Sequence, residues 1–258
     1  MTAKWFLAFV RTNTLALALM ALTVCGFGAT TARADGGVAP DHAPVSGNLA
    51  SLQHGAQLYA TYCMSCHSAS FVHYDQWRAL GFTPQQIQAM LPAGASMSDA
   101  LTSALRADDA KAAYGAVPPD LSLEARARSE DWLYMYLRSF YQDSARPGGW
   151  NNRMAENTAM PHILAALQGI RTAKFVDETD AKTGQPVRRF AGYQQVTPGT
   201  LSPAGYDAAV ADLVAYLSWM AGPEQKTRQQ LGAGVLVFLC VLSFLAWRLH
   251  AAYWKQIE

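Results

Sequence analysis

The most constraining feature of this 258-residue chain is the pentapeptide Cys63-Met-Ser-Cys66-His67. The spacing C-x-x-C-H is the attachment signature of a c-type haem. Residues i, i+3 and i+4 share one face of a helical turn, so the two thiols can bond the haem vinyl groups while the imidazole binds the iron. The motif predicts Cys63 and Cys66 as covalent attachment points and His67 as an axial iron ligand.

Two other kinds of site use paired cysteines, and neither fits this sequence. A thioredoxin-like dithiol opens a helix within a βαβ pattern, which the chain does not show. A zinc site needs more cysteines or paired histidines. The remaining cysteines, Cys25 and Cys240, lie in apolar terminal segments, and C-x-x-C-H occurs once. We therefore expect one covalently bound haem c.

The second axial ligand has to come from another part of the chain, as a thioether or a second imidazole. Met160 precedes Pro161, and a proline favours extended backbone at the residue before it, which suits a ligand presented by a loop. Met154 and His162 are the nearby alternatives. The residues alone favour Met160 but leave the choice open.

The two ends of the chain predict an exported protein with a membrane anchor. Residues 1–34 combine two basic residues, Lys4 and Arg11, with an apolar run and the small-x-small triplet Ala32-Arg33-Ala34, as in a cleaved signal peptide. A permanent transmembrane helix is the alternative reading. Residues 231–247 carry no charge and span about 26 Å as a helix, close to the ~30 Å hydrocarbon core of a bilayer. Residues 224–258 are thus expected to form a transmembrane anchor with a short cytoplasmic tail.

Residues 49–223 between these ends are predicted to form a mostly α-helical, cytochrome c-type haem domain, preceded by a linker at residues 35–48. Its expected elements are a helix that runs into the haem motif, a capping box at Thr83-Pro84-Gln85-Gln86, an aromatic helix at 130–141, a small β-ribbon at 174–196 that turns at 182–185, and a helix from Ser202-Pro203 to about Gly222.

The charge of the exported region argues against nucleic acid as a partner. Residues 35–222 carry 17 Asp and Glu against 13 Lys and Arg, a net charge of −4 before any haem carboxylates are added. Such a surface repels a phosphate backbone and favours a basic protein partner.

Several further blocks of sequence stand out between about Leu49 and the C-terminus. They are Gly55-Ala-Gln-Leu-Tyr59, Pro118-Pro119-Asp120-Leu121-Ser122, Glu130-Asp131-Trp132, Arg146-Pro-Gly-Gly-Trp-Asn151, Ala159-Met160-Pro161 and Ala221-Gly222-Pro223-Glu224. Together with the haem motif, these blocks resemble the cytochrome c1 family, the haem subunits of the ubiquinol–cytochrome c reductase (bc1) complex, in its compact bacterial form.

This resemblance implies roles for individual residues. Met160 would be the sixth iron ligand, Arg128 would pair with a haem propionate, and Pro118 and Pro119 would line the haem crevice. Trp132 stands where the family usually has tyrosine, so the hydrogen bond of that tyrosine hydroxyl cannot be carried over to this chain.

The resemblance also implies a cellular role. The chain would be a single-pass protein of the bacterial inner membrane with its haem domain in the periplasm. It would associate with a cytochrome b subunit, take electrons from a Rieske iron–sulfur subunit and reduce a soluble or tethered cytochrome c. It would be no enzyme on its own but a redox subunit of ubiquinol:cytochrome-c oxidoreductase, respiratory complex III. The alternative is another membrane-anchored c-type cytochrome that feeds a terminal oxidase.

Overall fold

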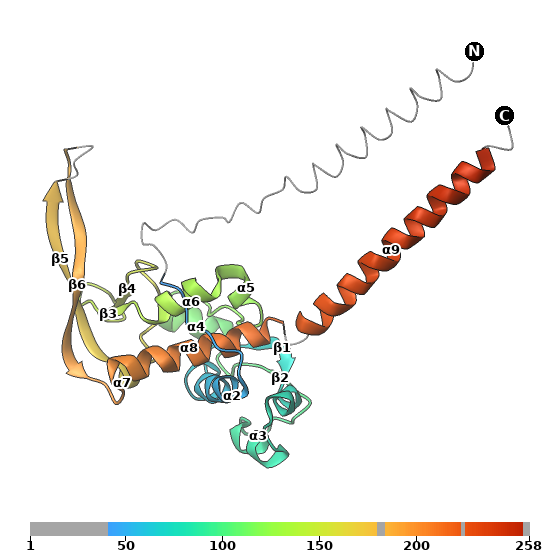
Figure 1. Cartoon of the computed structure of the whole chain (residues 1–258). Coiled ribbons are helices and arrows are strands. Elements are labelled where there is room, and N and C mark those ends of the chain that lie inside the picture. The colour runs from blue at the N-terminus through green and yellow to red at the C-terminus, as the bar shows by residue number, and fades with distance from the viewer. Residues whose placement is uncertain (1–40, 180–183, 223–224, 255–258) are drawn as a thin grey trace. The chain divides into compact units, whose positions relative to one another are not determined.

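The structure is a computed structural model that describes residues 41–179, 184–222 and 225–254 (Figure 1). The predicted signal peptide, the first part of the predicted linker, part of the predicted ribbon turn and both ends of the predicted segment 224–258 lie outside these residues. The helices are α2 (Leu49–Leu58), α3 (Pro84–Met90), α4 (Ala107–Tyr114), α5 (Glu124–Arg128), α6 (Glu130–Leu137), α7 (Ala165–Gln168), α8 (Pro203–Met220) and α9 (Gln225–Trp254), with a π-helical turn at Tyr59–Cys63 and a 3₁₀ helix at Tyr74–Leu80. The strands are β1 (Ala69–His73), β2 (Ala100–Leu101), β3 (Phe140–Gln142), β4 (Trp150–Asn152), β5 (Gly169–Thr179) and β6 (Pro186–Pro198). The predicted fold class, mostly α with a small β-ribbon and a C-terminal apolar helix, is confirmed.

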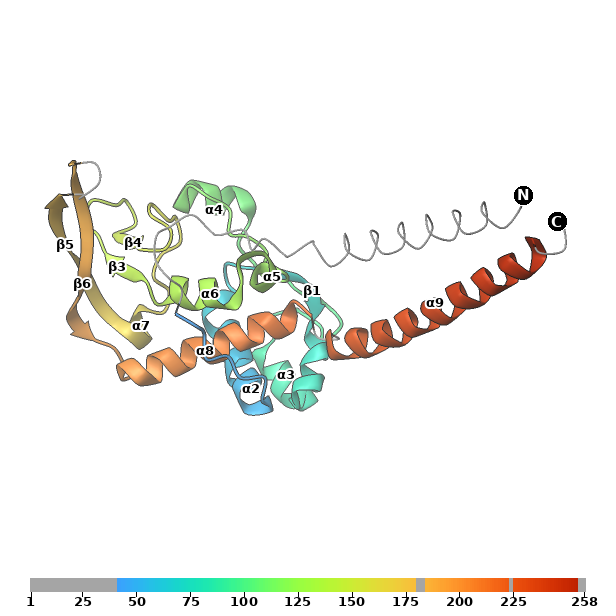
Figure 2. The ribbon, with the colours of Figure 1, turned by 45° about the horizontal axis from the view of Figure 1, so that its top comes forward.

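Helices α2 and α8 cross at close range and form much of the core (Figure 2). The crossing point is Gly55, because a Cβ there would overlap the carbonyl oxygen of Asp212 and lie 2.7 Å from the Cβ of Tyr216. One turn later the ring of Tyr59 packs 5.5 Å from that of Tyr216. The hydroxyl of Tyr216 in turn accepts a hydrogen bond from the indole of Trp77 at 2.7 Å. This buried cluster holds the end of α2 in place just before the haem motif.

The predicted helix starts are confirmed where capping residues marked them. The hydroxyl of Thr83 accepts a hydrogen bond from the backbone N–H of Gln86, whose side chain accepts one from the N–H of Thr83. The hydroxyl of Ser202 accepts a hydrogen bond from the N–H of Gly205 at the start of α8. These bonds satisfy backbone donors that the first turn of a helix leaves unpaired.

The aromatic helix is shorter than its sequence pattern predicted. Helix α6 ends at Leu137, and Phe140–Gln142 instead forms strand β3, antiparallel to β4 and parallel to β5. Asn152 in β4 donates a hydrogen bond from its side chain to the carbonyl of Tyr136 at 2.8 Å. The guanidinium of Arg138, the next residue after the helix, binds the carboxylate of Asp207 at 2.6 and 3.0 Å. The tertiary partners of this segment therefore outweigh its helical periodicity.

Strands β5 and β6 form a ribbon that is longer than predicted. They pair antiparallel from Gly169–Pro198 to Thr179–Pro186, and β3 and β4 extend the sheet in the order β4-β3-β5-β6. The ribbon lies beside the short helix α7, near the start of α8 (Figures 1 and 2). Arginine–aromatic stacking occurs on this ribbon in the pairs Arg188–Phe175, Arg153–Phe190 and Arg171–Tyr193.

The long C-terminal helix α9 has the properties expected of a membrane anchor. Residues 228–254, a stretch of 27 residues, are long and apolar enough to cross a bilayer, and the most apolar window is not buried against the rest of the chain. At ~1.5 Å per residue this stretch spans about 40 Å, more than the ~30 Å hydrocarbon core. It is the one helix of this kind among the residues described.

Candidate haem site

The two cysteines and the histidine of the motif lie on one tight turn, which directly follows the π-helical turn Tyr59–Cys63. The π-helical turn closes with a bond from the N–H of Met64 to the carbonyl of Tyr59, at 3.0 Å. The carbonyl of Cys63 then accepts hydrogen bonds from the N–H groups of Cys66 and His67, at 3.1 and 2.8 Å. Both cysteines are free thiols, with Cys63 buried and Cys66 partly buried. These bonds fold the backbone from Cys63 to His67 into a single turn.

The ring of His67 is held by a hydrogen bond that sequence analysis did not predict. Its Nδ1 lies 2.8 Å from the carbonyl oxygen of Pro119. A carbonyl can only accept, so this nitrogen carries the proton and the lone pair of Nε2 is left for a metal. Burial lowers the pKa of His67, against an opposing contribution from the Pro119 carbonyl. The neutral form that can bind iron is therefore favoured.

The block Pro118–Ser122 is fastened to the chain just after the motif. The carboxylate of Asp120 accepts hydrogen bonds from the N–H and hydroxyl of Ser70, at 2.8 and 2.7 Å, and from the N–H of Ser122 at 2.8 Å. Partial burial would raise the pKa of Asp120, but the hydrogen bonds from Ser122 and Ser70 outweigh burial and lower it. The resulting carboxylate holds in place the segment whose Pro119 carbonyl contacts His67.

Met160 lies on a loop that packs against the main core and faces helix α6. It is partly buried against the cluster that includes Cys63 and Met64. The hydroxyl of Tyr136 lies 3.5 Å from the sulfur of Met160 and 2.9 Å from the hydroxyl of Thr158. Burial raises the pKa of Tyr136, so its hydroxyl stays protonated and can donate. The environment of Met160 is thus apolar, with one hydroxyl directed at the sulfur.

The two alternatives to Met160 have other surroundings. The buried ring of His162 stacks on Phe140 at 5.0 Å and meets Trp150 edge-on at 5.2 Å. Burial lowers the pKa of His162 to about 4. Met154 is partly buried, and its N–H donates to the side chain of Asn152 at 2.8 Å. His162 is therefore enclosed by aromatic packing, whereas Met160 borders the core cluster that includes Cys63.

Arg128, the predicted propionate partner, lies at the end of α5. Its Nε is 3.4 Å from the carboxylate of Glu124, and its guanidinium lies over the ring of Trp132, 4.9 Å from the centroid. The side chain is 54% exposed. The arginine is thus accessible from solvent, although the side chain of its partner Glu124 is only 20% exposed.

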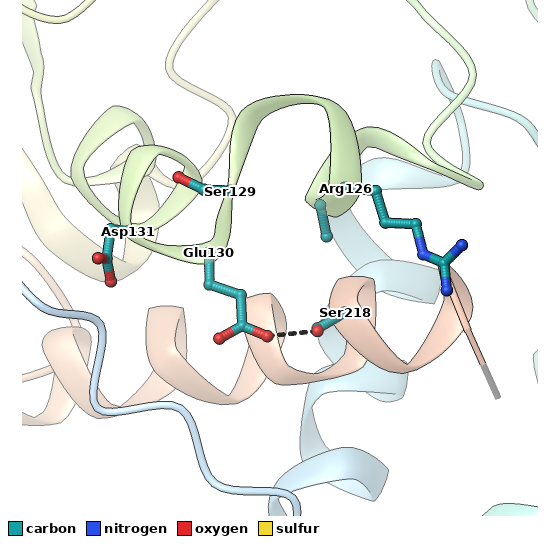
Figure 3. Close-up of a pocket in the computed structure, with 6 residues that line it drawn as sticks. Arg126, Ser129, Glu130, Asp131 and Ser218 are labelled. Carbon is teal, nitrogen blue, oxygen red and sulfur yellow. Dashed lines mark hydrogen bonds between the residues drawn. The ribbon is translucent and has the colours of Figure 1, made fainter. Parts of the chain in front are cut away.

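A surface pocket lies where α5 and α6 pass over α8, away from the haem motif in its lining residues (Figure 3). Within that pocket Glu130 accepts a hydrogen bond from Ser218. Its lining is polar and consists of Ala125, Arg126, Ser129, Glu130, Asp131 and Ser218. None of the predicted haem-binding residues lines it. Among the described residues, no group of three or more His, Cys, Asp or Glu side chains could hold a metal ion.

The donor set fits a c-type haem. It provides two free thiols, an imidazole with one nitrogen occupied and the other free, and a thioether that packs against the same core. Crossed helices α2 and α8, with the motif joined to α2 by the π-helical turn, complete the arrangement. Fold and site together define the domain of a c-type cytochrome.

Comparison with known proteins identifies the family. A model of the cytochrome c1 family matches residues 46–257. Cytochrome c1 of Allochromatium vinosum is 40% identical over 81% of this chain and 85% of its own length. A Nitrosomonas europaea protein named ammonia monooxygenase gamma subunit is 38% identical over 84% and 88%, and cytochrome c1 of Rhodospirillum rubrum is 29% identical over 80% and 82%. The chain belongs to the cytochrome c1 family, which confirms the resemblance and the expectation of one covalent haem c.

Two contacts of the site were missed by sequence analysis. The carbonyl of Pro119 holds His67 across 52 positions, and no local pattern reveals such a pair. The second missed contact joins the hydroxyl of Tyr136 to the sulfur of Met160. Tyr136 follows Trp132 by four residues in α6, and the two rings stack with their centroids 4.9 Å apart. That i, i+4 spacing places both rings on one helical face, so Tyr136 could have been predicted to lie on the same side of the helix as Trp132.

Proposed function

We propose that this chain is the electron-transfer haem subunit of a bc1 complex in the bacterial inner membrane, with its haem domain in the periplasm and α9 as its anchor. It accepts one electron from a Rieske iron–sulfur subunit and passes it to a soluble or tethered cytochrome c. Quinol oxidation takes place elsewhere in the assembly, which also contains a cytochrome b subunit. Membership of the cytochrome c1 family and the apolar helix α9 support this role.

We infer that Cys63 and Cys66 bind the haem through thioether bonds, with His67 and Met160 as its axial ligands. The observation that carries this assignment is the 2.8 Å contact of His67 with the Pro119 carbonyl, because it fixes the ring and frees Nε2. When bound, the haem supplies a one-electron couple between Fe(III) and Fe(II). With His67 and Met160 both bound, the iron would have no position left for small exogenous ligands.

The remaining residues of the site hold the ligands and exclude water. The hydroxyl of Tyr59 donates to the carbonyl of His67 at 3.1 Å and so ties the ligand to the α2–α8 core. Pro118 and Pro119 are proposed to form one wall of the crevice. Arg128 is proposed to turn from Glu124 toward a propionate. With the haem bound, burial and thioether ligation would both favour Fe(II) and so keep the potential high.

Replacing Met160 by leucine in the full chain tests the ligand assignment. Leucine conserves volume, so a mere packing residue would lose less than about 1.5 kcal/mol of stability and leave the haem spectrum unchanged. If Met160 binds iron, the near-infrared sulfur-to-iron(III) charge-transfer band disappears and the potential falls, while the haem stays covalently bound. Met154→Leu is the matched control and should retain the band. A band that survives in Met160→Leu but not in Met154→Leu would move the assignment to Met154.

Purification of the full-length chain from its native membrane tests the assembly. Subunits and haem types are counted in the purified complex. Co-purification with a cytochrome b and a Rieske protein is the expected result. Co-purification with a terminal oxidase instead would contradict the proposal and favour the anchored-carrier alternative.

A further inference from the structure

Two hydroxyl groups and the sulfur of Met160 form a short chain of polar contacts. The hydroxyl of Tyr136 lies 3.5 Å from Sδ of Met160, a distance at which a hydroxyl can donate to sulfur. The same hydroxyl lies 2.9 Å from Oγ1 of Thr158, two positions before the methionine. The hydroxyl of Tyr136 has a single proton and can donate it to only one of these two neighbours.

Thr158 determines which neighbour receives the proton. If Thr158 donates to the oxygen of Tyr136, the tyrosine proton points at the sulfur, and both hydroxyl protons have a partner. In the reverse arrangement Tyr136 donates to Thr158. The hydroxyl proton of Thr158 and the sulfur of Met160 would then both lack a hydrogen-bond partner among the described residues. Partly buried polar groups favour the arrangement that pairs every donor. The chain of donation therefore runs from Thr158 to Tyr136 to Met160.

The position of the Tyr136 hydroxyl is fixed by packing rather than by this contact alone. Its ring stacks on Trp132 at 4.9 Å with planes 10° apart, and Phe140 meets it edge-on at 5.1 Å. The carbonyl of Tyr136 accepts the 2.8 Å hydrogen bond from Asn152. The ring is held on two sides, so removing the hydroxyl alone should leave it in place.

We propose that the hydroxyl pair Thr158–Tyr136 tunes the reduction potential of the haem through a hydrogen bond to the sulfur of Met160. This inference rests on the proposed role of Met160 as an iron ligand. A thioether sulfur has two lone pairs, so one can bind iron while the other accepts from Tyr136. The hydrogen bond withdraws electron density from the sulfur, and Fe(III) loses more from this than Fe(II). The pair therefore raises the potential, and Tyr136 acts as a positioning residue for the ligand.

The relay is the chain of hydrogen bonds from Thr158 through Tyr136 to Met160. Three variants of the full-length, haem-loaded chain test it by redox titration and near-infrared absorbance. Tyr136→Phe removes the hydroxyl and keeps the ring, so the midpoint potential should fall while the charge-transfer band persists at a shifted wavelength. Thr158→Val removes the first donor and should lower the potential less, in the same direction. Thr158→Ser keeps a hydroxyl and should restore the wild-type potential. An unchanged potential in Tyr136→Phe, with the band intact, would overturn the relay.

Tyr134→Phe is the matched control for general loosening of the helix. Tyr134 lies in α6 and is buried, and its ring packs against the guanidinium of Arg138, 4.5 Å away. Removing its hydroxyl should leave the potential unchanged, and a fall equal to that of Tyr136→Phe would contradict the relay. The Met160→Leu spectrum separates the two proposals. A band lost there shows that the ligand assignment stands even if the relay fails, whereas a band retained there overturns both.

Discussion

Replacing Gly55 by alanine tests the helix crossing that holds the haem motif. A Cβ at this position overlaps the carbonyl oxygen of Asp212 and approaches the Cβ of Tyr216 to 2.7 Å. Both obstacles belong to α8, as backbone or as the first side-chain carbon. No change of rotamer can relieve them, so the two helices have to move apart.

The size of the effect follows from two opposing contributions. Alanine is favoured over glycine in a helix by about 1 kcal/mol. Overpacking of a core costs about 1–3 kcal/mol, and rigid obstacles place Gly55→Ala near the upper end of that range. The expected net loss is about 2 kcal/mol, opposite in sign to helix propensity. For a domain of this size that corresponds to a fall of about 4–8 °C in Tm.

Thermal unfolding of the haem-loaded chain, followed by Soret absorbance and circular dichroism, measures this loss. Gly47→Ala is the control, because a Cβ there meets nothing within 4 Å, and its Tm should stay close to that of the wild type. Gly47 precedes α2 and has an ordinary φ, so the substitution introduces no strain. A Gly55→Ala protein that unfolds at or above the wild-type temperature would refute the close crossing.

Three further outcomes are expected. The pKa of Asp120 lies below its ordinary value of 3.8 in the folded chain, so its carboxylate stabilises the fold above that value, and this contribution is lost as the pH falls through the folded pKa. Asp120→Asn should therefore be less stable than the wild type at neutral pH, and the difference should shrink in acid. A difference in stability that stays the same at every pH would contradict this. Deletion of residues 224–258 should yield a soluble, exported haem domain, and a product that stays membrane-bound would contradict a single anchor. Electron transfer to a basic cytochrome c should slow between ~0.01 and ~0.1 M salt, as the Debye length falls from about 30 to 10 Å, and a flat rate would exclude steering by acidic residues such as Asp108 and Asp109.

Features encoded by neighbouring residues were predictable from the sequence. The motif at Cys63–His67 places its donors on one turn whatever surrounds it, because their spacing matches the helical repeat. The capping residues Thr83 and Ser202 marked two helix starts by satisfying local backbone donors. The apolar run within α9 indicated an anchor by length and composition alone. In each case the decisive interaction lies within a few residues, or within the segment itself.

Other features depend on which distant segments meet. Helix α6 stops at Leu137 because β3 pairs with strands that lie later in the chain, and this overrides an aromatic pattern that continues to Tyr141. The bond from His67 to the Pro119 carbonyl and the contact of Tyr136 with Met160 join residues 52 and 24 positions apart. A hydrogen bond tolerates only a few tenths of an ångström, so it requires the register of the packed elements, which no local pattern contains. The residue types of the proposed haem site can thus be predicted from the sequence, whereas the orientation of their side chains depends on tertiary packing.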